Sequence, residues 1–162
     1  MAKAQSMYNT PPTFSIYVAG LVYEWIKSQG GVSAIEAENE KKSTLLYNAI
    51  DESPICTGRV TDNSMRSRMN VVFRLHQRGD STPDAELESR FLKEAADAGF
   101  MGVKGHRSIG GLRVSLYNAI TLEQVSTMTL AACSLYCLHF VPIPPGSSQL
   151  IAIHAVNHAL AC

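Results

Sequence analysis

The stretch Lys104-Gly-His-Arg-Ser-Ile-Gly-Gly-Leu-Arg-Val-Ser-Leu-Tyr-Asn118 places one histidine and two arginines around a double glycine. His106 and Arg107 precede the glycine pair 110–111, and Arg113 follows it. Glycines permit a positive φ and a close approach of the backbone, which favours a tight turn. Two guanidinium groups and an imidazole at one turn suit a ligand with two anionic groups, such as a carboxylate and a phosphate. A basic surface turn without a ligand is the alternative, and the stretch alone does not decide between them.

A second motif, Tyr8-Asn-Thr-Pro-Pro-Thr-Phe14, precedes a predicted helix whose apolar residues recur at helical spacing until the glycine pair 30–31. The two prolines favour the first helical turn, and Thr10 or Thr13 can cap it. Free backbone N–H groups and the helix dipole favour an anion at such a terminus. Asn9 and Thr10 are therefore candidate anion ligands, and an ordinary capped helix is the alternative.

The residues between these motifs predict a small α+β domain in which helices cover one face of a sheet. A capping box at Ser33–Glu36 opens a second helix that ends at 51–54. Its solvated face is expected to hold Glu36, Glu38, Glu40, Lys41 and Lys42, with Ile35, Leu45, Leu46, Ala49 and Ile50 inward. Further predicted elements are a strand at 69–76, a helix from Pro83 to Gly99, short strands at 100–103 and 112–116, and a helix beginning at Thr121.

Two arginines just before the strand at 69–76 admit two interpretations. Arg66 and Arg68 could bind an anion, but a surface entry to the strand is the favoured interpretation.

Charge is distributed very unevenly along the chain. The 14 basic and 14 acidic residues all lie at or before Glu123, and Ser126 to Cys162 contains none. A globular domain is about a quarter charged throughout, so a boundary is predicted between Val125 and Ser126. The formal net charge of +0 does not favour a nucleic-acid partner. The N-terminus lacks the apolar core of a signal peptide, and four cysteines are too few for a secreted disulfide scaffold, so a cytoplasmic protein is expected.

The uncharged tail permits three interpretations. Spacing typical of zinc ligands is found for Cys133, Cys137, His139, His154 and His158. Residues 127–143 are apolar over a length at the lower limit for a membrane span. The favoured interpretation is that the tail is read-through sequence that is not homologous to the domain type before it. No metal site and no membrane partner are therefore predicted.

The two motifs occur in an order that resembles the C-terminal domain of the phosphoserine aminotransferases, a family of pyridoxal-phosphate enzymes of serine biosynthesis. The resemblance runs from about Ala2 to Val125, with Val114 at a position where the family pattern has a small alanine. It implies the small domain of a fold-type-I transferase, without the large cofactor domain. The implied organisation is an interdomain segment and helix at 1–30, the small domain at 31–125, and a non-homologous tail at 126–162.

The resemblance also implies roles for particular residues. Asn9 and Thr10 would reach across a homodimer interface to the phosphate of the pyridoxal 5'-phosphate held by the neighbouring subunit. Arg113 would clamp the substrate α-carboxylate, while His106 and Arg107 would face the distal phosphate or carboxylate. The implied reaction transfers an amino group between glutamate and 3-phosphohydroxypyruvate, giving phosphoserine. The residues themselves do not distinguish a phosphate from a second carboxylate.

A pyridoxal-phosphate transaminase needs a lysine for the Schiff base and an aspartate for the pyridinium nitrogen. The resemblance places both upstream of the residues matched here, and Lys104 does not align with that lysine. No catalytic residue is therefore assigned, and the isolated chain is expected to be inactive. Two other hypotheses remain: a non-catalytic module that pairs with full-length subunits, and a small anion-binding domain with a metal or membrane tail.

Overall fold

The computed structural model describes residue 3 and residues 9–130, and the chain forms two compact units that divide between Ala37 and Glu38. The predictions for residues 131–162 lie outside the described residues.

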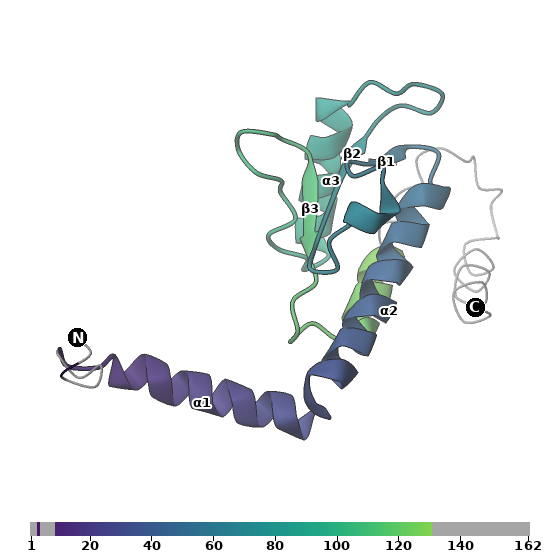
Figure 1. Cartoon of the computed structure of the whole chain (residues 1–162). Coiled ribbons are helices and arrows are strands. Elements are labelled where there is room, and N and C mark those ends of the chain that lie inside the picture. Colours follow the sequence, from purple (N-terminus) through teal and green to yellow (C-terminus); the bar gives the residue numbers. More distant parts are fainter. Residues whose placement is uncertain (1–2, 4–8, 131–162) are drawn as a thin grey trace. The chain divides into compact units, whose positions relative to one another are not determined.

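The first unit contains the predicted N-terminal helix, α1, which spans Thr13–Ser28 (Figure 1). It follows two prolines and ends before Gly30 and Gly31, whose φ angles are 94° and 84°. The predicted threonine cap is wrong: the N-cap is Pro12 and forms no side-chain cap, while the Thr13 hydroxyl donates to the Pro11 carbonyl at 3.1 Å. The first turn of α1 therefore keeps N–H groups that no capping side chain satisfies.

Helix α2 spans Gly31–Glu52 and crosses from the first unit into the second. It begins two residues before Ser33, so the predicted capping box is wrong and Ser33 lies within the helix. The prediction of a solvated Lys42 is also wrong, because this side chain is only 2 % exposed. Its ammonium group donates to the carbonyl oxygens of Tyr117 at 3.1 Å and Ile120 at 2.8 Å, which explains how the charge is accommodated.

The second unit contains an antiparallel sheet in the order β1-β2-β3, formed by Cys56–Gly58, Asn70–Leu75 and Leu112–Ser115. Strands β2 and β3 confirm the predictions at 69–76 and 112–116. The strand expected at 100–103 is wrong, because no strand forms there. The Val103 carbonyl accepts from the Arg113 N–H at 2.7 Å, and the next residue, Lys104, forms an isolated bridge with Leu112. Strand β1 was not predicted, since three residues are too few for an alternating pattern.

Helix α3 spans Ala85–Asp97 and begins at an aspartate cap. The Asp84 carboxylate accepts from the backbone N–H groups of Glu86 and Leu87 at 2.9 and 3.0 Å. The helix ends near Gly99, as predicted, with a φ of 88° at that glycine. A further helix runs through residues 122–130, which confirms the prediction of a helix near Thr121.

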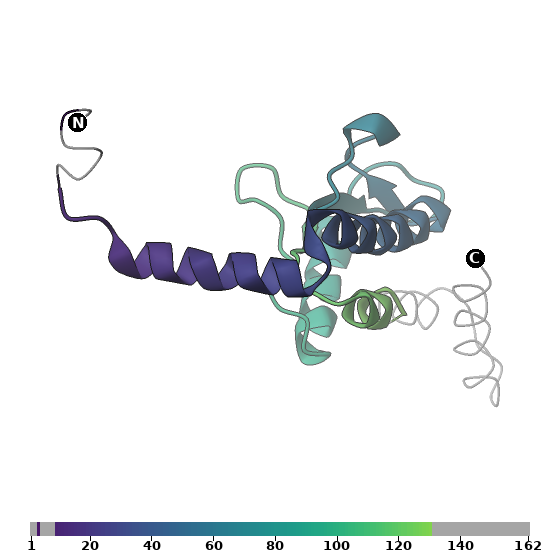
Figure 2. The ribbon, with the colours of Figure 1, turned by 60° about the horizontal axis from the view of Figure 1, so that its bottom comes forward.

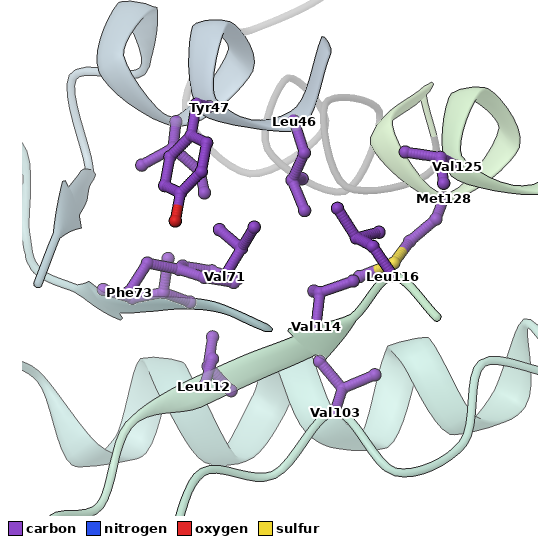
Figure 3. Packing of buried hydrophobic residues seen from close by; sticks show 12 residues of the cluster. Leu46, Tyr47, Val71, Phe73, Val103, Leu112, Val114, Leu116, Val125 and Met128 are labelled. Carbon is purple, nitrogen blue, oxygen red and sulfur yellow. The ribbon is translucent and has the colours of Figure 1, made fainter. Parts of the chain in front are cut away.

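The hydrophobic core lies on one face of the sheet. Figure 3 shows side chains of α2 and of residues 122–130 directed toward side chains of β2 and β3. Phe91 of α3 contacts Phe73 edge-to-face, with ring centroids 6.2 Å apart. The core residues are Leu46, Tyr47, Ile50, Val71, Phe73, Leu75, Val103, Leu112, Val114, Leu116, Val125 and Met128. Helix α2 and the helix at 122–130 thus cover this face, and the alternate residues of β2 and β3 point to the other.

Candidate functional site

The glycine-rich stretch forms a closed loop at residues 104–111, directly before β3. The Gly105 N–H donates to the Gly111 carbonyl at 2.9 Å, which joins the two ends of the loop. At its tip, the Gly110 N–H donates to the His106 carbonyl at 2.8 Å. Figures 1 and 2 show this green segment extending away from the sheet. The predicted tight turn is confirmed.

Two glycines at the base of this loop, Gly105 and Gly111, lie where a side chain would collide with neighbouring atoms. Gly111 has a φ of 75°, and a Cβ atom there would lie 3.0 Å from the Phe73 carbonyl oxygen and 2.5 Å from Cδ of Arg74. A Cβ atom on Gly105 would lie 2.7 Å from the Gly111 carbonyl oxygen. Only a backbone without side chains can approach this closely, so the two glycines fix how the loop leaves the sheet.

The loop presents its histidine and its arginine to solvent. His106 and Arg107 are both exposed. Nδ1 of His106 accepts from the Ser108 N–H at 3.3 Å, so in the neutral ring the proton lies on Nε2 and can be donated outward. Both side chains are therefore available to an anion that approaches the loop.

Two arginines lie on the face of the sheet opposite the core, and their surroundings differ. Arg113 on β3 pairs with Val72 on β2, so Arg74, two residues further along β2, is its diagonal neighbour on the same face. Nε of Arg74 donates to the Glu88 carboxylate at 2.6 Å. Nε of Arg113 is buried, and no hydrogen-bond partner lies near it among the described residues. Arg74 thus has a carboxylate partner, whereas the Nε of Arg113 has no hydrogen-bond partner among the described residues.

Arg113 also borders a cavity of about 320 Å³ between β3, the segment 99–103 and the helix at 122–130. The lining is largely apolar and includes Phe100, Val103 and Met128. Part of Arg113 therefore lies beside a mostly apolar space.

The arginines before β2 are engaged in structural contacts. Arg66 forms a bidentate pair with Asp51 at 2.5 and 2.9 Å and lies over the Tyr47 ring, 4.6 Å from its centroid. The bonded Asp51 carboxylate raises the pKa of Arg66 above its ordinary value. Arg68 lies 3.7 Å from the Glu40 carboxylate. These contacts agree with the favoured interpretation of a surface entry to the strand.

Asn9 and Thr10 lie in the first unit, immediately before α1, and both are exposed. The amide and hydroxyl groups can donate hydrogen bonds, and the first turn of α1 carries no side-chain cap. This set of donors fits a phosphate group chemically. The other candidate ligands, on and beside the loop at 104–111, belong to the second unit.

Sequence reasoning missed two polar residues of α2 that anchor the turn after β3. Besides Lys42, Asn39 is buried and its amide nitrogen donates to the Asn118 side-chain oxygen at 2.9 Å. Both residues share helical spacing with the buried Leu46, a signal that would have placed them on the inward face. Lys42 and Asn39 thus hydrogen-bond to the turn that follows β3, the strand that carries Arg113.

Comparison with known proteins first defines the class. The model of the class-V aminotransferase family matches residues 1–128, and the chain therefore belongs to that family. Its relatives within the family are phosphoserine aminotransferases, which confirms the resemblance found in the sequence.

The enzyme of Bacillus cereus is 52% identical over 127 residues, and that of Listeria monocytogenes is 53% identical over 127 residues; each alignment covers 78% of this chain and 33% of the relative. The chain thus spans about a third of the length of the curated relatives that it matches.

Solved structures give the same result for the fold. The phosphoserine aminotransferase of Bacillus circulans subsp. alkalophilus has a TM-score of 0.72 at 43% identity, over 80% of this chain and 34% of that chain. The enzyme of Trichomonas vaginalis, solved with pyridoxal phosphate bound, has a TM-score of 0.71 at 38% identity, over 80% of this chain and 35% of that chain. The described part is therefore a mixed α+β portion of the phosphoserine aminotransferase fold.

The described residues contain neither a membrane-spanning helix nor a cluster of potential metal ligands. No helix in residues 9–130 is long and apolar enough to cross a membrane. Within the same part of the chain, no group of three or more potential metal ligands was found.

Proposed function

We propose that this chain is the C-terminal, substrate-binding portion of a pyridoxal-phosphate-dependent phosphoserine aminotransferase. The observation that carries the proposal is Arg113, a cation with a buried, unpartnered Nε beside an exposed basic loop, in a chain that belongs to the class-V aminotransferases. The natural substrates would be phosphoserine and glutamate with their keto acids. The full-length enzyme would be a homodimer.

Each candidate residue has a distinct part in this proposal. The Arg113 guanidinium binds the α-carboxylate, because its planar donors match the two oxygens of a carboxylate. His106 and Arg107 bind the distal phosphate or carboxylate from the exposed loop. Together, the three groups select a substrate with anions at both ends.

Asn9, Thr10 and the first turn of α1 would hold the phosphate of the cofactor. When bound, pyridoxal phosphate supplies the electron sink for transfer of the amino group. Residues outside the matched third would supply its covalent attachment. This chain's own contribution is then to bind and orient the substrate.

Calorimetric titration of the purified chain with phosphoserine tests the proposal. Arg113→Gln should weaken binding by about 10- to 100-fold, since a charged hydrogen bond contributes about 1.5–3 kcal/mol. The control is Arg78→Gln, which removes an exposed cation from the loop between β2 and α3. Equal binding by the two variants, or no binding by the natural chain, would count against the assigned site.

A second candidate function is a non-catalytic module that pairs with full-length subunits. The observation that favours it is α1, in which no residue is buried although most are apolar. The exposed fraction is 78% for Phe14, 62% for Tyr17 and 69% for Tyr23. A helix that is apolar on all sides is normally covered in the assembled protein.

Co-expression with a tagged full-length phosphoserine aminotransferase tests this candidate. A pairing module should co-purify with the tagged subunit, and Tyr17→Glu in α1 should abolish the association. The matched control is Tyr117→Glu, an exposed tyrosine in the second unit. A chain that purifies alone would exclude the module.

A further inference from the structure

The ladder between β2 and β3 ends where the candidate anion loop begins. Its last pair is Phe73↔Leu112, and the next odd-numbered residue of β2, Leu75, would face Gly110 if the ladder continued. Instead, the Leu75 N–H donates to a carboxylate oxygen of Glu88 at 3.3 Å, and the Leu75 carbonyl accepts from the Asp84 N–H at 2.8 Å. The start of α3 thus takes the hydrogen bonds that the loop would otherwise make.

The same Glu88 carboxylate holds Arg74 against the loop. It accepts from Nε of Arg74 at 2.6 Å and from Nη2 at 3.4 Å. Glu88 is 7% exposed, so the pair is largely shielded from water. The Arg74 side chain lies directly against Gly111, where a Cβ atom would come within 2.5 Å of Cδ and 3.1 Å of Nε. Arg74 therefore forms the surface on which the base of the loop rests.

We propose that Arg74 and Glu88 are positioning residues for the anion site. Glu88 ends the β2–β3 ladder and orients Arg74, and Arg74 supports Gly111, so that the loop carrying His106 and Arg107 leaves the sheet in one fixed direction. The pair does not contact the ligand. The predicted effect on ligand binding rests on the proposed function. The support of the loop by Arg74 and Glu88 is a property of the ligand-free chain.

A second consequence concerns charge. Arg74 and Arg113 share one face of the sheet, and Glu88 neutralises Arg74. Without Glu88, two cations would face the same region, and an anion could bind at either. Glu88 thereby directs a carboxylate to Arg113, and its loss should reduce the preference for that position.

Amide hydrogen exchange of the ligand-free full chain tests whether Arg74 and Glu88 hold the base of the loop in place. Glu88→Gln should increase exchange of the Gly105 amide, which bonds to the Gly111 carbonyl, by at least about 10-fold. The Leu116 amide, which bonds to the Met69 carbonyl in the same sheet, should stay protected. The matched control is Glu86→Gln, which removes an exposed carboxylate from the same helix. Equal exchange at Gly105 in both variants, or equal loss of protection at Gly105 and Leu116, overturns the proposal.

The double variant Arg74→Met/Glu88→Gln avoids leaving one buried charge without its partner. It should show the same selective exchange at Gly105, and a protected Gly105 amide in this variant overturns the proposal.

Titration with inorganic phosphate, followed at the His106 and Arg107 amides, then tests the consequence. Arg74→Met/Glu88→Gln, which removes the support without leaving a free cation beside the loop, should weaken phosphate binding several-fold, while Glu86→Gln should leave it unchanged; unchanged binding in the double variant overturns the positioning role. If phosphate does not shift the His106 and Arg107 amide signals of the unsubstituted chain, the proposed function fails. Selective exchange at Gly105 then decides alone whether Arg74 and Glu88 support the loop.

Discussion

At the scale of single residues, burial rather than residue type decides which charges are available to a ligand. Lys42 belongs to a charged run on α2, yet it is among the most buried side chains of the chain. It lies four residues before Leu46 on the inward face, and its ammonium group bonds to carbonyls about 75 positions away. Helical spacing could have placed it inward, but the two carbonyl partners exist only in the folded chain.

Lys42→Met is predicted to destabilise the chain by about 1–3 kcal/mol near neutral pH, because the Tyr117 and Ile120 carbonyls lose their donor. Burial lowers the pKa of Lys42 below its ordinary value of 10.5, an effect that Glu38 partly opposes. Between the lowered pKa and 10.5 the folded chain binds fewer protons than the unfolded chain, so the contribution of Lys42 to stability rises with pH in that window.

The measurement for Lys42 is denaturant unfolding of the natural chain and the variant across this alkaline window. Burial raises the pKa of Tyr47, which gives a trend of opposite sign above 10.0, but that trend is common to both proteins and cancels in their difference. Lys41→Met, at an exposed neighbouring position, is the control. A stability difference that does not change with pH would refute the assigned role.

At the scale of elements, local patterns predicted α1, β2, α3 and β3 because each carries a clear period or an evident terminal signal. The same patterns missed β1, which is only three residues long and owes its existence to β2. They also predicted a strand at 100–103, where the structure has one hydrogen bond from the Arg113 N–H to Val103 and an isolated bridge at the next residue, Lys104. Elements that depend on a distant partner cannot be predicted from their own residues.

The cap of α3 provides a test at this scale. Hydrogen bonds to Asp84, from the Leu87 N–H first and then from the Gln77 side chain and the Glu86 N–H, lower its pKa below 3.8. The folded chain holds this carboxylate deprotonated more strongly than the unfolded chain, so its stabilisation is present above 3.8 and lost as pH falls through the lowered pKa.

Asp84→Ala should therefore lower the melting temperature at neutral pH, whereas Asp84→Asn, which can also cap, should lower it less. The difference between the natural chain and Asp84→Asn should shrink in acid. Thermal unfolding followed by circular dichroism measures both effects. Identical melting of all three proteins would show that the cap does not stabilise α3.

At the scale of the whole molecule, the sequence predicted the family, because two short motifs carry the resemblance, while the ligand roles of the candidate residues stay predictions. His106, Arg107 and Arg113 do lie on or beside one loop, and the structure adds the reason why Arg113 is available and Arg74 is not. The part played by Glu88 was missed, although its spacing from Phe91, Leu92 and Ala95 places a carboxylate on the buried side of α3. Its partner, Arg74, lies on β2, so the pairing of the two residues is evident only in the folded chain.

The purified chain alone is predicted to have no phosphoserine transaminase activity, because it spans about a third of the relatives that it matches and we assign no catalytic residue to it. The assay is glutamate formation from phosphoserine and 2-oxoglutarate, with protein expressed in a host that lacks its own enzyme. Full-length enzyme prepared in parallel is the positive control. Turnover by the chain would show that it contains catalytic groups that we have not assigned.

In the proposed function, the loop at 104–111 and Arg113 bind the two anionic ends of one substrate. Nuclear magnetic resonance titration of the isotope-labelled chain tests it most directly, with phosphoserine, serine and inorganic phosphate as three separate ligands. We predict that phosphoserine shifts the signals of His106, Arg107 and Arg113 together, that phosphate shifts mainly His106 and Arg107, and that serine shifts mainly Arg113. If phosphoserine leaves these three signals unchanged, or shifts only exposed cations elsewhere such as Arg78, the assigned site is contradicted.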